Sequence, residues 1–175
     1  PHRSVGSTPQ LIRTIADAVG KPDAGEALVK RTQEQIDQAK KQIAAWKPAK
    51  PMRVAFLYVR GNAGVFFILG SENGASELIQ GVGADDVASD KGITTLVPAN
   101  AESLVSINPD AIFVMRDGLA STGGMKGLLA RAGVANTTAG RKQRVISIPD
   151  GISLSFGPQT GEVLTAVAKA LYGVK

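Results

Sequence analysis

The residues with the most specific chemistry in this 175-residue chain are Tyr58 and Arg60, at the end of the apolar run 53–59. Two residues spaced by two on an extended strand share one face, so the guanidinium can reach the phenol oxygen. A nearby cation favours the phenolate over the phenol, and a phenolate is a hard anionic ligand that can hold ferric iron, including haem iron. The spacing equally fits a tyrosine packed against a helix beside a solvated arginine, and spacing alone leaves both interpretations open.

Residue counts exclude most other chemistry. The chain has no cysteine and a single histidine, His2, which removes thiolate sites, multi-histidine zinc sites and nearly all histidine-based triads. The net charge of +5 is dispersed along the chain, so we expect no nucleic-acid binding. No serine stands in a Gly-x-Ser-x-Gly context, and we expect no enzyme. An acidic cluster, formed by Asp85, Asp86 and Asp90, is expected to lie in a solvated loop.

The first 50 residues predict two helices. Ser7 and Pro9 mark a helix start, and Gly20 marks its end. A longer helix is predicted over 23–46, about 36 Å long at 1.5 Å per residue. Its apolar positions form a narrow stripe on a polar rod, so we expect it to pack along the outside of a domain or to bridge two. A coiled-coil strand is the alternative.

Beyond the proline-punctuated segment 47–51, strand and helix signals alternate. Apolar runs predict strands at 53–59, 65–69, 111–115 and 144–148, and amphipathic or capped segments predict helices at 75–80, 102–106, 125–132 and 161–172. This alternation is typical of an α/β domain with a mostly parallel sheet. The predicted fold is a three-layer, Rossmann-like α/β lobe preceded by a long helix.

Ligands of open α/β sheets bind beyond the carboxyl ends of the strands. The first predicted strand delivers Tyr58 and Arg60 into the glycine-rich turn 61–64, the third delivers residues 115–118, and the fourth delivers residues 149–151. These three strand ends are therefore the predicted site.

Three segments together resemble a known family. They are VAFLYVRGNAG (54–64), ESLVSINPD (102–110) and TGGMKGLLARAGVANTTAG (122–140), and the likeness continues through 153–172. They are similar to the carboxyl-terminal lobe of haem-specific substrate-binding proteins of bacterial ABC importers, whose two α/β lobes are joined by one long helix. The second segment is shared with siderophore and cobalamin binders, whereas Tyr-x-Arg and the Gly-Gly loop indicate haem.

The resemblance implies a role for individual residues. Tyr58 would be the axial ligand of the haem iron, and Arg60 would hydrogen-bond its phenolate. Residues that would line the porphyrin face or meet its propionates are Met115, Arg116, Gly123 and Lys126. Glu102 would dock on arginines of the permease. Gln159 departs from the family pattern, in which arginine is more usual, and His2 is expected to be a mobile terminal residue.

The resemblance also implies an organisation. Residues 1–22 would be a remnant of a preceding lobe with a short helix, 23–50 the connecting helix and linker, and 51–175 the ligand-binding lobe. The partners would be haem, an ABC permease and its ATPase, at an extracytoplasmic location, with membrane association only through a lipid anchor absent from this chain. With one lobe, haem is expected to bind weakly, on an exposed face, or not at all. A ferric siderophore or cobalamin carrier is the alternative.

Overall fold

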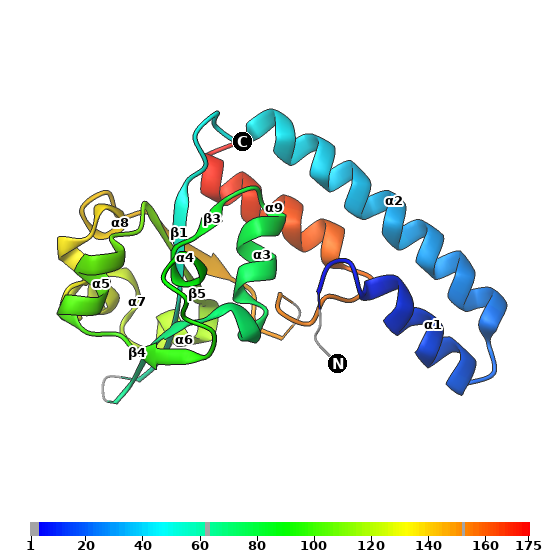
Figure 1. Ribbon diagram of the computed structural model, residues 1–175, viewed down its shortest axis with the longest axis horizontal. Helices are drawn as coiled ribbons and strands as arrows, with labels where there is room; N and C mark the ends of the chain where they lie inside the picture. Colours follow the sequence, from blue (N-terminus) through cyan, green and yellow to red (C-terminus); the bar gives the residue numbers. More distant parts are fainter. Residues whose placement is uncertain (1–3, 62–63, 152) are drawn as a thin grey trace.

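The computed structural model describes residues 4–61, 64–151 and 153–175. Its amino-terminal part is a hairpin of two helices, α1 (Thr8–Ala18) and α2 (Pro22–Trp46) (Figure 1). The two helices approach closely at Gly25, where an added Cβ would lie only 2.4 Å from the Cβ of Ala16. An ion pair between Arg13 and Glu26 joins their exposed faces. Both helices lie where the sequence predicted them.

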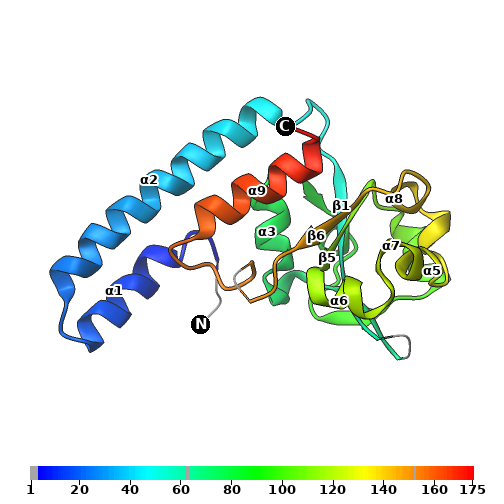
Figure 2. The ribbon, with the colours of Figure 1, turned by 180° about the vertical axis from the view of Figure 1, so that it is seen from behind.

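The long helix α2 runs alongside the last helix, α9 (Thr160–Tyr172), and forms the outer layer of the molecule (Figures 1 and 2). Gly161 permits this contact, because an added Cβ would lie 2.7 Å from the backbone of Gln35. The buried positions of α2 form the narrow stripe that the sequence predicted: Gly25, Val29, Thr32, Ile36, Ala39 and Ile43. At the end of α2, Trp46 packs against the core, with the Lys169 ammonium 5.8 Å from its ring centre.

The central sheet has the strand order β4-β2-β1-β5-β6, and β3 also pairs with β1. The strands are β1 (Arg53–Arg60), β2 (Val65–Leu69), β3 (Asp85–Asp86), β4 (Leu96–Pro98), β5 (Ala111–Met115) and β6 (Val145–Ile148). Strands β3, β5 and β6 extend the sheet in parallel, whereas β2 pairs antiparallel with both β1 and β4. The sheet is therefore mixed and mostly parallel, as predicted.

Hydrophobic cores cover both faces of the sheet, and this produces the three layers of the predicted fold. One face packs under α9 and α3 (Ala75–Gly81) through Phe56 and Phe113, whose rings meet edge to face. The opposite face buries Leu57 and Val114 with side chains of the remaining helices. These helices are α4 (Val87–Asp90), α5 (Ala101–Ile107), α6 (Arg116–Ser121), α7 (Gly124–Leu129) and α8 (Thr138–Arg141).

The structure differs from the sequence predictions mainly in short elements. The glycine-rich turn after β1 joins an antiparallel hairpin, and both Gly61 and Gly64 have positive φ angles, which glycine adopts without strain. Several short elements were not predicted, because they lack the mostly apolar run that indicated the equally short strands β2, β5 and β6. They are β3, α4, β4, α6 and α8 and the 3-10 turns η1 (Ser71–Asn73) and η2 (Val134–Asn136). No helix among the described residues has the length and apolarity needed to cross a membrane.

The prediction of a solvated acidic loop was wrong for Asp86. Its carboxylate is buried, accepts the Ala88 amide at 3.0 Å as the cap of α4, and is hydrogen-bonded by the Ser76 hydroxyl. Burial raises the pKa of Asp86 above its ordinary value. Within the described residues, no group of acidic or histidine side chains is arranged to hold a metal ion.

Candidate functional site

The predicted site lies at one edge of the sheet. Because β1, β5 and β6 are parallel, the residues that follow them meet at the same end, which we call the carboxyl edge (Figure 2). There, Arg60 ends β1, Met115 ends β5, and Pro149 and Asp150 follow β6. The structure thus brings together the three strand ends that the sequence singled out.

Tyr58 stands on this edge as a half-buried side chain. Its ring packs against the core cluster on the α9 face of the sheet, next to Phe56 in the alternating pattern of β1. Among the described residues, no hydrogen bond ties its hydroxyl to a backbone carbonyl. The other tyrosine, Tyr172, is different, because its hydroxyl donates to the Val82 carbonyl at 2.7 Å and burial raises its pKa. The Tyr58 phenol lies instead beside the guanidinium of Arg60.

Arg60 lies over the ring of Tyr58, as their shared face predicted. The guanidinium carbon is 5.6 Å from the ring centre, and Nη2 is 3.4 Å from a carboxylate oxygen of Asp150. The Tyr58 hydroxyl, and secondarily the Asp150 carboxylate, raise the pKa of the Arg60 guanidinium, although partial desolvation acts in the opposite direction. The arginine therefore stays cationic at any physiological pH, beside a phenol.

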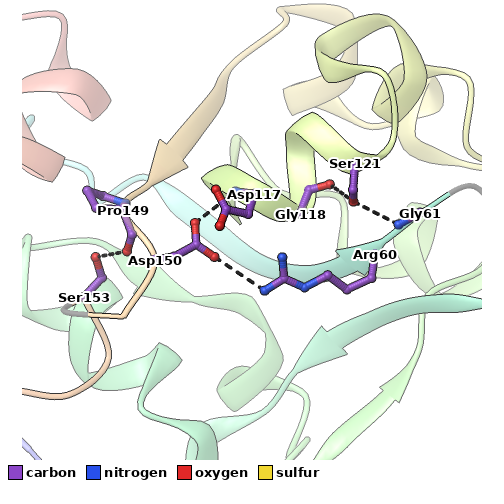
Figure 3. A network of polar contacts seen from close by, with 8 residues as sticks. All are labelled: Arg60, Gly61, Asp117, Gly118, Ser121, Pro149, Asp150 and Ser153. Atoms are coloured by element: carbon purple, nitrogen blue, oxygen red, sulfur yellow. Dashed lines mark hydrogen bonds and ion pairs between the residues drawn. The ribbon is translucent and has the colours of Figure 1, made fainter.

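Arg60 belongs to a network of polar contacts (Figure 3). The second oxygen of Asp150 accepts the backbone amide of Asp117 at 2.9 Å, at the start of α6. The Ser153 hydroxyl donates to the Pro149 carbonyl at 2.6 Å and closes the loop after β6. On the other side, the amide of Gly61 donates to the Ser121 hydroxyl at 2.9 Å. The network joins the ends of β1 and β6 to α6.

Sequence reasoning missed Arg131 and Ser121, which hold the turn after β1. Arg131 follows α7, stacks on Phe66 with its guanidinium carbon 5.0 Å from the ring centre, and donates to the Gly61 carbonyl. Neither residue follows a strand, so the rule that selects strand ends could not find them. Asp150 was selected by that rule, but nothing in the sequence indicated its contact with Arg60.

The structure brings Met115 to Tyr58 but leaves other predicted residues apart. The pairing of Leu57 with Val114 puts Tyr58 and Met115 on the same face and at the same level of the sheet, and Met115 packs against the same core. Arg116 begins α6 with its side chain exposed to solvent.

Gly123 and Lys126 belong to the junction of α6 and α7, a region that packs on the opposite face of the sheet from Tyr58. Both are exposed, and within the described chain no hydrogen bond or ion pair connects them with Tyr58 or Arg60. Glu102 is exposed in the first turn of α5, away from the network. His2 lies outside the described residues.

Two grooves border α9 among the described residues. One of about 430 Å³ runs between α2 and α9, and another of about 230 Å³ lies between α9 and Pro149. Tyr58 lines neither of them. The described part of the carboxyl edge carries the half-buried Tyr58, the guanidinium of Arg60 and the carboxylate of Asp150.

The sequence pattern of the family described as periplasmic binding protein matches residues 3–151. The chain belongs to this family. Its members are binding proteins, and their location agrees with the predicted extracytoplasmic one.

Solved structures of three haem-binding proteins are similar to the chain. The haem-binding protein HmuT is 48% identical over the whole chain with a TM-score of 0.96, and the chain spans 56% of HmuT. The periplasmic haem-binding protein RhuT from Roseiflexus sp. RS-1 is 35% identical over 97% of the chain, with a TM-score of 0.91, and 64% of RhuT is covered. BhuT, solved in complex with two haems, is 31% identical over 99% of the chain, with a TM-score of 0.88 and 64% of BhuT covered.

More distant matches show the fold alone. An ABC-type Fe3+-hydroxamate transport protein from Saccharomonospora viridis is 16% identical, with a TM-score of 0.78, and covers 97% of the chain. No curated protein matches the chain. The chain spans little more than half the length of HmuT and less than two thirds of RhuT and BhuT.

Proposed function

We propose that this chain is the haem-binding part of a substrate-binding protein of an ABC importer, and that Tyr58 binds ferric haem through its phenolate. The observation that carries the proposal is the pair at the carboxyl edge. It combines a half-buried phenol, with no backbone acceptor among the described residues, and a guanidinium 5.6 Å from its ring centre. Haem is here the cargo, and the protein performs no reaction on it.

The comparisons support haem over other cargo. Three similar proteins at 31–48% identity are named as haem-binding. HmuT was also solved as variants in which one tyrosine, one arginine and one histidine were each replaced by alanine. That tyrosine and that arginine are two positions apart, the spacing of Tyr58 and Arg60.

Each residue of the carboxyl edge would have a separate role in binding haem. Tyr58 supplies a hard anionic oxygen to the ferric ion, and Arg60 stabilises the negative charge of that oxygen. Met115 would contact the porphyrin ring of the haem, beside Tyr58. The exposed cation Arg116, at the start of α6, would meet an anionic propionate, whereas contacts of Gly123 and Lys126 with haem stay a prediction.

We propose that delivery uses a separate surface. Glu102 is exposed on α5, away from Tyr58, so it can contact arginines of a permease while haem is bound. The permease and its ATPase are the implied partners. The division into residues 1–22, 23–50 and 51–175 stays a prediction, with α2 as the connecting helix. Weak binding of haem by this single lobe stays a prediction.

Absorption titration with haemin tests the proposal. The wild-type chain should give the spectrum of high-spin ferric haem bound to tyrosinate, and Tyr58→Phe should lose it. Tyr172→Phe is the matched control, since it removes the other phenol and should keep the spectrum. The same affinity and spectrum in Tyr58→Phe would overturn the proposal. If the chain does not bind haemin but binds a ferric siderophore or cobalamin, the alternative cargo would be established.

A further inference from the structure

We propose that Asp150 is a positioning residue, which holds the Arg60 guanidinium over Tyr58 and thereby strengthens the hold on haem. The inference rests on the proposed function, in which Tyr58 is the iron ligand. Asp150 would act only through Arg60 and would not touch the cargo. Its carboxylate uses its two oxygens for different groups, Oδ1 for Arg60 and Oδ2 for the amide of Asp117.

Asp150 is the fixed member of the ion pair. Its side chain is short, it is anchored by the Asp117 amide at 2.9 Å, and only 26% of it is exposed. The loop that carries it begins at Pro149, whose φ angle is fixed by its ring, and is closed by the hydroxyl of Ser153. The carboxylate therefore stays at one place on the carboxyl edge without help from Arg60.

Arg60 is the longer and more exposed member of the ion pair. Its side chain has four rotatable bonds and is 40% exposed, so ordering it costs conformational entropy. Its two neighbours lie on different strands: the ring of Tyr58 on β1 and the carboxylate of Asp150 after β6. Figure 3 shows the guanidinium pointing toward the Asp150 carboxylate, and the ring of Tyr58 is its second neighbour. Without the carboxylate, the ring contact alone would hold the cation.

Asp150→Asn isolates this contact. The asparagine oxygen can still accept the Asp117 amide, but the neutral side chain no longer attracts the guanidinium. Because exposed ion pairs contribute little to stability, we expect haem to bind about 1.4- to fivefold more weakly. Glu26→Gln is the matched control, because it breaks the exposed ion pair with Arg13 and changes the net charge equally. Its affinity for haem should equal that of the wild-type chain.

A double-mutant cycle separates positioning from a structural role. If Asp150 acts through Arg60, Asp150→Asn should weaken binding in the wild-type chain but add nothing in an Arg60→Gln background. An equal loss in both backgrounds would overturn the proposal, because Asp150 would then act on the fold of the edge. No loss in either background would overturn it as well.

A measurement on the chain without haem tests the same contact independently. NMR order parameters of the Arg60 Nε–H should be high in the wild-type chain and fall in Asp150→Asn, while those of other arginines stay unchanged. Unchanged order at Arg60 would refute the positioning role even if Tyr58 binds haem. If Tyr58→Phe keeps the haem spectrum while Arg60 loses order in Asp150→Asn, the proposed function fails and the contact stands.

Discussion

Replacing Arg60 by glutamine should weaken haem binding because it removes the cation beside the proposed phenolate. The guanidinium carbon lies 5.6 Å from the ring centre. At that distance two unit charges interact by roughly 0.7 kcal/mol in bulk water, and by about 1.5 kcal/mol at half that dielectric constant. The Arg60 side chain is 40% exposed, so we take the effective dielectric constant around it to lie between these two values. We therefore expect Arg60→Gln to bind haem about three- to twelvefold more weakly.

Competition with apomyoglobin, followed in the Soret band, measures this change. Arg13→Gln is the control, because Arg13 is also exposed and ion-paired, but with Glu26 on the helix hairpin. Its haem affinity should equal that of the wild-type chain, which excludes an effect of net charge. The reasoning fails if Arg60→Gln binds as tightly as the wild-type chain, or if Arg13→Gln loses as much affinity.

Two further predictions concern stability, measured by chemical denaturation. Thr32→Val should raise the free energy of unfolding by about 1–2 kcal/mol, since the buried Thr32 hydroxyl has no partner among the described residues. Thr160→Val is the contrast: it should lower the free energy of unfolding, because it loses the hydrogen bond from the Thr160 hydroxyl to the Gly157 carbonyl. Asp86→Asn should gain stability relative to the wild-type chain as pH rises above about 4. The pKa of the Asp86 carboxyl is raised in the folded state, so this group stabilises the fold below its unfolded pKa and loses that contribution as the pH passes its folded pKa. A stability difference that does not depend on pH would contradict this.

Most of the fold could be predicted because its large elements carry strong local signals. The stripe of Val29, Ile36 and Ile43 predicted α2, and the apolar run ending at Tyr58 predicted β1. The short elements have no such signal. The capping role of Asp86 depends on Ser76, ten residues earlier, so its buried position could not be read from a run of acidic residues.

The candidate site was predictable only in part, for a similar reason. Tyr58 and Arg60 share a face because of the two-residue repeat of a strand, and the structure places the guanidinium over the ring. The contact of Arg60 with Asp150 spans 90 residues, and that of Arg131 with Gly61 spans 70. Such contacts follow from strand order and loop path, which no local pattern contains.

Resonance Raman spectroscopy of the ferric haem complex tests the iron–phenolate bond most directly. With ring-deuterated tyrosine incorporated, the wild-type complex should show tyrosinate modes that shift with the label. These modes should persist in Tyr172→Phe and vanish in Tyr58→Phe. Tyrosinate modes that survive in Tyr58→Phe, or a wild-type complex without them, would contradict the assignment of Tyr58 as the iron ligand.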